Sequence, residues 1–325
     1  MDTMIIEKLK SKVLRGELID KAEALSLIDA PLEPLCKAAN EIREHFCKND
    51  FDICTIVNAK SGRCSEDCKY CAQSARYCTG AEEYPLMSTD EILKLAKYND
   101  ERGVLRYSIV TSGKKLNDKE VDALCETIRV LNRETSVSIC ASLGLLSYEQ
   151  FKKLKDAGLK RVHNNLETSR NNFKNVCTTH TYDDKIESIK NAQKAGLEVC
   201  SGGIMGLGET MEDRIDMVLD IRSLGVRSIP VNMLNAIKGT PYENNARLTN
   251  DDMRRIVAIF RFIIPNGAIR LAGGRGLLPD KGKACFTSGA NAAISGDMLT
   301  TSGITIENDM KMLENLSYKA AMING

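Results

Sequence analysis

The chain has 325 residues, of which 43% are hydrophobic and 27% are charged, and its formal net charge is +1. This composition argues against disorder and against a general electrostatic attraction to nucleic acid or to a membrane surface. Because Arg261, Pro265 and Asn266 interrupt the most apolar stretch, and the first residues carry mixed charge, we expect neither a membrane span nor a signal peptide. Twelve cysteines then favour metal or cluster chemistry in a cytoplasmic protein over a disulfide framework.

Residues 1–48 predict helices, because apolar residues recur near helical spacing in two runs that Pro31 and Pro34 separate. We expect this segment to form a cap outside the main domain, or to contribute to a subunit interface.

From residue 51 onward, short β-rich runs alternate with amphipathic helical runs. The helical runs cover 89–101, 118–132, 148–157, 182–195, 212–223 and 251–264, and several end in glycine, as helix C-caps often do. The expected strands cover 52–58, 106–111, 136–142, 161–167, 198–205, 228–234, 268–272 and 292–295. Eight such units predict an α/β fold, a parallel (β/α)8 TIM-type barrel, with a doubly wound open sheet as the alternative. We divide the chain into an N-terminal helical cap (1–48), a barrel domain (49–303) and a C-terminal extension (304–325).

Three cysteines directly follow the first predicted strand, at the catalytic end of a barrel. Cys64, Cys68 and Cys71 lie within eight residues, so their thiolates can reach one soft metal centre. No fourth cysteine follows at matching spacing, since Cys78 lies seven residues further on. Three ligands on a four-iron cluster leave one iron open to another molecule. A structural zinc site is the alternative, but the three histidines, at 45, 163 and 180, are not near this segment in the sequence.

Two further strands carry candidate binding residues. Glycines at 202 and 203, before Ile204, allow a ligand to approach the backbone, although a tight-packing turn is the alternative. On the fourth strand, alternation places His163, Asn165 and Glu167 on one face, and Asn164 on the other, away from the barrel interior. A polar face inside a barrel is costly unless it binds a ligand, such as ribose hydroxyls or a polar heterocycle, or forms its own network.

A second set of thiols lies near the starts of predicted strands: Cys54 on the first, Cys140 on the third and Cys200 on the fifth, with Arg270 on the seventh. Each alone is typical of a core residue, but their common depth suggests a second metal–sulfur centre below the first. The remaining cysteines at 36, 47, 125 and 177 are interpreted as structural, and those at 78 and 285 are undecided.

The three-cysteine spacing, with Tyr70 before the last cysteine, and the glycine-rich fifth strand resemble the radical S-adenosylmethionine (SAM) enzymes. Within them, the chain is similar to the biotin synthase family. The similar segments are 58–62 with 71–74, 165–169, 200–210, 231–234 with 238–241, 270–275, and 289–292 to 300–301.

The resemblance implies a homodimeric barrel enzyme that converts dethiobiotin to biotin. A [4Fe-4S] cluster on Cys64, Cys68 and Cys71 would pass an electron to SAM, releasing a 5′-deoxyadenosyl radical, and an auxiliary iron–sulfur cluster would supply sulfur. It also implies an electron donor such as flavodoxin or ferredoxin. By this resemblance SAM is bound by Tyr70, Asn165, Glu167, Gly202, Gly203 and Ile204. The ureido ring is bound by His163, Asn165 and Asn232, and the carboxylate tail by Thr300 and Thr301.

Three positions depart from the family's pattern. Where the family has a second-strand cysteine at the auxiliary site, this chain has Ser108, and its first strand carries Cys54 instead. We hypothesise the ligand set Cys54, Cys140, Cys200 and Arg270, with Cys78 in reserve, for a cluster whose type is undetermined. His163 stands where asparagine is usual, which leaves room for a changed substrate, and Asn164 stands where histidine is usual. The alternatives are another radical SAM enzyme, such as a mutase or a maturase, and a non-catalytic cluster-binding or zinc-binding protein.

Overall fold

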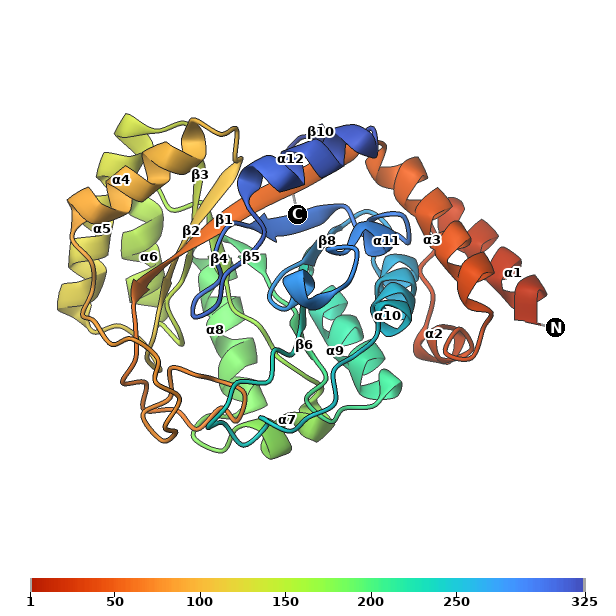
Figure 1. Ribbon diagram of the computed structural model, residues 1–325, viewed down its shortest axis with the longest axis horizontal. Helices are drawn as coiled ribbons and strands as arrows, with labels where there is room; N and C mark the ends of the chain where they lie inside the picture. The colour runs from red at the N-terminus through yellow and green to blue at the C-terminus, as the bar shows by residue number, and fades with distance from the viewer. Residues whose placement is uncertain (1, 324–325) are drawn as a thin grey trace.

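The structure is a computed structural model that describes residues 2–323. Three helices, rather than two, form the N-terminal cap: α1 (Asp2–Leu14), α2 (Lys21–Leu25) and α3 (Leu32–Cys47). Pro31 is the N-cap of α3, which suits a residue whose φ is fixed and which lacks an N–H. The cap packs beside α10 (Asn250–Ile263), outside the barrel (Figure 1).

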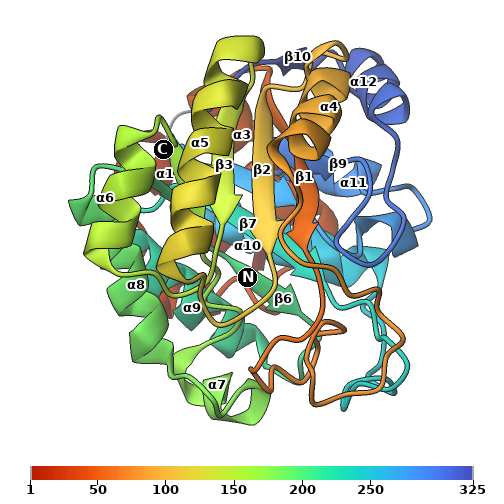
Figure 2. The same cartoon turned by 90° about the vertical axis from the view of Figure 1, so that its left-hand side faces the viewer.

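A closed parallel barrel forms the centre of the molecule (Figures 1 and 2). Its strands pair in the order β1-β2-β3-β4-β5-β7-β8-β9, β9 pairs again with β1, and β6 pairs with β7. Because the first strand has a partner on each side, the open-sheet alternative is excluded and the predicted barrel is confirmed. The bounds are β1 (Asp50–Lys60), β2 (Arg106–Thr111), β3 (Ser138–Ser142), β4 (Arg161–His163), β5 (Glu198–Cys200), β6 (Gly203–Met205), β7 (Ser228–Met233), β8 (Ala268–Leu271) and β9 (Ala292–Ser295).

Two predicted strands depart most from their expected bounds. The fourth ends at His163 rather than Glu167, and the fifth is divided into β5 and β6. These strands therefore leave the regular ladder directly before the residues expected to bind ligands.

Helices surround the barrel, as Figure 2 shows, and most begin at a side-chain cap. In α4, α5 and α6 the N-cap and the third helical residue satisfy each other's backbone N–H groups, which explains where each helix begins. The bounds are α4 (Thr89–Asp100), α5 (Asp118–Glu134), α6 (Tyr148–Asp156), α7 (Arg170–Val176), α8 (Tyr182–Lys194) and α9 (Met211–Ser223). The short α7 was not predicted.

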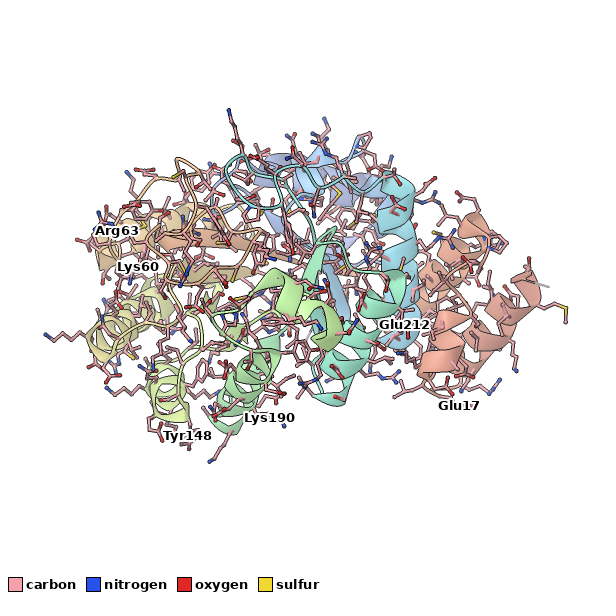
Figure 3. The ribbon with its side chains drawn as sticks, turned by 90° about the horizontal axis from the view of Figure 1, so that it is seen from below. Glu17, Lys60, Arg63, Tyr148, Lys190 and Glu212 are labelled. Carbon is pink, nitrogen blue, oxygen red and sulfur yellow. The ribbon has the colours of Figure 1, made fainter. Side chains whose placement is uncertain are left out.

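The C-terminal part packs onto the barrel through η1 (Arg275–Leu277), α11 (Lys283–Phe286), α12 (Ile306–Asn315) and β10 (Lys319–Ala320). Buried Arg275 donates to Asp309 of α12 at 2.9 Å, and β10 pairs in parallel with the start of β1. Among the described residues, no helix is long and apolar enough to cross a membrane. Seen from below, Lys60 and Arg63, beside the cysteine loop, lie at the opposite end of the molecule from Glu17 in the cap (Figure 3).

Candidate active site

One cavity of about 390 Å³ occupies the barrel interior and collects nearly all of the predicted site residues. It extends from the cysteine loop, residues 64–71, down to the strand residues of the second thiol set. Of the predicted residues, those that line it are Cys54, Cys64, Tyr70, Cys71, Cys140, His163, Asn165, Glu167, Cys200, Ile204, Asn232, Arg270, Thr300 and Thr301. Cys68, Gly202 and Gly203 do not line it.

Backbone hydrogen bonds fold the cysteine loop back on itself. Cys64 N donates to Gln73 O at 3.0 Å, and Cys71 N donates to Cys68 O at 2.9 Å. Burial is the main cause that raises the pKa of Cys71 to about 11, so this thiol stays protonated at neutral pH without a metal. Three thiols on one loop, two of them facing the cavity, fit a thiophilic metal centre that takes their protons on binding.

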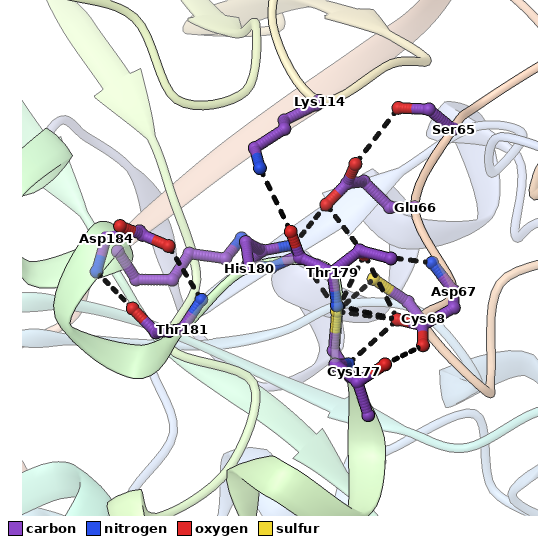
Figure 4. A network of polar contacts seen from close by, with 12 residues as sticks. Ser65, Glu66, Asp67, Cys68, Lys114, Cys177, Thr179, His180, Thr181 and Asp184 are labelled. Atoms are coloured by element: carbon purple, nitrogen blue, oxygen red, sulfur yellow. Dashed lines mark hydrogen bonds and ion pairs between the residues drawn. The ribbon is translucent and has the colours of Figure 1, made fainter.

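Cys68 lies against two residues that the sequence analysis did not connect to it (Figure 4). Its Sγ is 3.7 Å from Sγ of Cys177, which is 3.3 Å from Nδ1 of His180. The interpretation of Cys177 as merely structural is therefore incomplete, and His180, remote in sequence, is near the cysteine loop in space. The two residues come from the connection between α7 and α8, and no spacing signal links that connection to the loop.

The residues after β4 form a polar wall of the cavity. Asn165 donates from Nδ2 to Glu167 at 3.3 Å and accepts from Gly202 N at 3.1 Å. Glu167 has a φ of 71°, an uncommon value for a non-glycine residue, so the surrounding structure must maintain this backbone conformation. Burial, followed by the nearby Glu167 carboxylate, raises the pKa of Tyr70, which therefore remains a neutral phenol beside it.

The prediction that Asn164 faces away from the barrel interior is wrong. Strand alternation stops at His163, and Asn164 also lines the cavity, where Lys185 donates to its Oδ1 at 3.4 Å. Its Nδ2 is buried without a hydrogen-bond partner among the described residues.

Backbone packing accounts for the glycines at 202 and 203. A Cβ on Gly202 would lie 1.9 Å from the carbonyl oxygen of Pro230, and one on Gly203 would lie 2.4 Å from that of Glu167. The strands thus approach too closely for any side chain at these positions, and Ile204 is the residue of this segment that reaches the cavity.

Asn232 is held rigidly at the cavity wall. Its Nδ2 donates to Gly203 O at 3.1 Å, and its Oδ1 accepts from Gly273 N at 2.9 Å. A carboxamide has two N–H groups and two lone pairs, so one of each remains for a polar ligand.

The lower part of the cavity holds the second thiol set with its guanidinium groups. Arg270 donates from Nη1 to Cys54 Sγ at 3.3 Å, and Cys200 Sγ contacts Ser228 Oγ at 2.9 Å and Arg161 Nη1 at 3.8 Å. Burial by itself would raise the pKa of Cys200. Arg161, His163 and Arg270 together have a larger, opposite effect, so the net result is a pKa lowered to about 6. By contrast, burial raises the pKa of Cys54. Burial also raises the pKa of Cys140, to about 12.

Two arginines of the lower cavity, Arg106 and Arg161, were missed by the sequence analysis. Asp52 lies between Arg106 and Arg270, each at 3.0 Å, and Arg161 pairs with Glu198. Three guanidinium groups against two carboxylates leave one excess positive charge. Three thiols in this setting fit an anionic iron–sulfur centre, because the arginines offset the charge of thiolates that the metal ionises.

Neither undecided cysteine belongs to the cavity. Cys78 is exposed and does not line it, so the structure does not support Cys78 as the reserve ligand. Cys285 is fully buried in the hydrophobic core at α11.

Comparison with known proteins gives concordant matches. The model of the Radical SAM superfamily matches residues 59–221, and that of the Biotin and Thiamin Synthesis associated domain matches residues 230–319. The chain is 63% identical to a biotin synthase of Brachyspira hyodysenteriae, over 97% of this chain and 94% of that protein. It is 58% identical to one of Akkermansia muciniphila, over 98% and 99%. Among solved structures, methylornithine synthase (PylB) aligns with a TM-score of 0.84 at 18% identity over 97% of both chains, a likeness of fold.

Proposed function

We propose that this chain converts dethiobiotin to biotin by inserting sulfur. The chain belongs to the radical SAM superfamily and, within it, to the biotin synthase family. Its cofactors are a [4Fe-4S] cluster, SAM and an auxiliary iron–sulfur cluster. When bound, the first cluster and SAM supply a 5′-deoxyadenosyl radical and the auxiliary cluster supplies the sulfur. The observation that carries the proposal is the single cavity that joins the cysteine loop to the lower thiols.

The protein's own part is to hold the two centres apart and to position the substrate between them. We assign Cys64, Cys68 and Cys71 to the first cluster. Asn165, Glu167, Tyr70 and Ile204 are assigned to SAM, because they line the cavity next to that loop. Gly202 and Gly203 are assigned with them as the backbone behind this wall, where Gly202 N donates to Asn165. The closed sheet surrounds the lower cavity, which would limit the contact of the reacting carbons with water and position them between the two centres.

Substrate binding is assigned to residues at the middle and rim of the cavity. His163, Asn165 and Asn232 would bind the ureido ring, and Asn164 joins them as an amide with an unpartnered N–H. Thr300 and Thr301 line the cavity from the loop after β9 and are assigned to the carboxylate tail.

For the auxiliary cluster we propose the ligands Cys54, Cys140, Cys200 and Arg270. All four are buried and line the lower cavity, and Arg270 already contacts Cys54. Ser108 lines the same region, but its hydroxyl is a harder and weaker ligand for iron than a thiolate.

Anaerobic turnover tests the function. The reconstituted enzyme, with SAM, dethiobiotin and a reductant, is expected to form 5′-deoxyadenosine and biotin together. Deoxyadenosine without biotin would instead indicate another radical SAM reaction on this scaffold, such as that of a mutase or a maturase. If the reconstituted protein contains zinc and no labile sulfide, both proposed enzyme functions are contradicted.

We further infer that the enzyme acts as a homodimer in the cytoplasm, with flavodoxin or ferredoxin as the electron donor. The twelve cysteines, all free in the structure, suit a reducing compartment and support the location. The dimer and the electron donor follow from the resemblance to the family. Analytical ultracentrifugation and reduction assays with each donor test these inferences.

A further inference from the structure

Beside the cavity, three side chains form a compact group of metal-ligating atoms: Cys68, Cys177 and His180. Their Sγ and Nδ1 atoms all lie within 4.8 Å of one another, and Cys177 and His180 are buried. Figure 4 shows them converging from the cysteine loop and from the connection between α7 and α8. The proposed reaction uses only Cys68 of the three.

Two of the three separations match the edges of a tetrahedral zinc site, and the third, between Cys68 and His180, is below 4.8 Å. With Zn–S of about 2.3 Å and Zn–N of about 2.05 Å, ideal edges are about 3.8 Å between two sulfurs and about 3.5 Å between sulfur and nitrogen. The corresponding separations are 3.7 Å for Cys68–Cys177 and 3.3 Å for Cys177–His180. Zinc therefore needs little rearrangement to enter.

The surrounding backbone holds the two contributing segments together. Asp67 accepts from Thr178 N at 2.8 Å and from Thr179 N at 3.2 Å, and Lys69 N donates to Val176 O at 3.0 Å. The fold thus places the ligands side by side before any ion arrives.

A carboxylate lies next to the group but outside it, and it contacts only the imidazole of the three. Oε2 of Glu66 is 2.6 Å from Nδ1 of His180, and it also accepts from Thr179 Oγ1 at 2.8 Å. Two thiolates and one imidazole, with a water in the fourth position, make a donor set that suits zinc, and the carboxylate of Glu66 orients the imidazole.

We propose that the cluster-free chain binds one zinc ion through Cys68, Cys177 and His180, and that this ion must leave before the [4Fe-4S] cluster can assemble. The mutual exclusion follows because one thiolate, Cys68, is needed by both centres. The exclusion rests on the proposed function, whereas the zinc site itself does not.

Cobalt(II) and zinc titrations of the cluster-free full chain test the site. Tight cobalt binding is expected with thiolate charge-transfer and tetrahedral d–d absorption, reversed by zinc. Cys177→Ala and His180→Gln should each abolish the binding of one metal equivalent, or weaken its affinity about 100-fold, because each variant loses one ligand. The matched control is Cys125→Ala, which deletes a buried thiol of α5 that does not belong to the group, and it should keep the full stoichiometry.

The double variant Cys64→Ala/Cys71→Ala separates this site from zinc held by the loop cysteines alone. The proposal expects the double variant to keep the Cys177-dependent equivalent. Two results would overturn it. In the first, the double variant loses the ion while Cys177→Ala and His180→Gln keep it. In the second, Cys177→Ala binds as much zinc as the wild-type chain. Circular dichroism of each variant confirms folding.

Cluster reconstitution tests the exclusion. Zinc-loaded wild-type chain should gain iron and sulfide more slowly than zinc-free chain, whereas Cys177→Ala should show no such difference. Equal rates in the wild type would contradict the exclusion. Neither readout uses turnover, so a failure to form biotin would count against the proposed function alone.

Discussion

Arg270 and Cys54, from β8 and β1, contact each other across the barrel floor, with Arg270 Nη1 3.3 Å from Cys54 Sγ. The same nitrogen donates to the backbone oxygens of Asp52 at 2.8 Å and of Ala293 at 3.1 Å. These bonds fix the guanidinium in place, so the thiol on the first strand lies at a defined position in the lower cavity.

Cys54→Ala should remove the auxiliary cluster and leave the first one intact, because one of three thiolate ligands is lost. Mössbauer spectroscopy, with iron and sulfide analysis, measures this. Ser108→Ala is the control and should retain both clusters. An intact auxiliary cluster in Cys54→Ala would refute the ligand assignment.

Asn232→Ala should raise KM for dethiobiotin about 5- to 150-fold, because a buried hydrogen bond to a substrate is worth about 1–3 kcal/mol. Steady-state kinetics of biotin formation measures this, and cluster content should not change. Asn308→Ala, at an exposed position of α12, is the control and should leave KM unaltered. An unchanged KM in Asn232→Ala would remove this residue from the substrate site.

Asp309→Asn should lower the free energy of unfolding by about 3–5 kcal/mol, because it leaves the buried guanidinium of Arg275 without its counter-charge. Denaturant unfolding of the cluster-free chain provides the measurement. Glu314→Gln changes a carboxylate of the same helix at an exposed position and should stay within about 0.5 kcal/mol of wild type. Equal stability of the two variants would show that α12 does not depend on this pair.

Gly202→Ala should prevent the barrel from folding normally, because the new Cβ would overlap the carbonyl oxygen of Pro230. Gly276→Ala is the matched control, since a Cβ there meets nothing within 4 Å and the backbone needs no positive φ. Soluble yield and thermal unfolding compare the two. A folded Gly202→Ala with wild-type stability would mean that β5 and β6 can separate from β7.

The periodicity of the sequence was sufficient to predict the barrel. The strands at 106–111 and 292–295 are confirmed at the same bounds, because their apolar runs are buried on both faces and end at clear breaks. The alternation argument did not extend to Asn164, because β4 ends one residue earlier and the chain no longer follows the pleat. Where a strand ends depends on tertiary contacts that no local pattern contains.

The missing parts of the site come from long-range contacts. His180 and Cys177 reach Cys68 from more than a hundred residues away, so spacing rules for metal motifs do not detect them. Arg106 and Arg161 did leave a signal, since a charged residue at an inward-facing position of a predicted barrel strand must have a partner.

The strand β10 has a consequence for synthesis of the protein. It pairs with the first residues of β1, and Ile323 N donates to buried Asp52 at 3.1 Å. A nascent chain therefore lacks this cover beneath Asp52 until residues 319–323 have been made, nearly 270 positions after the strand they protect. The buried ion pairs of Asp52 with Arg106 and Arg270 therefore reach their final surroundings only after the last strand of the chain has been made.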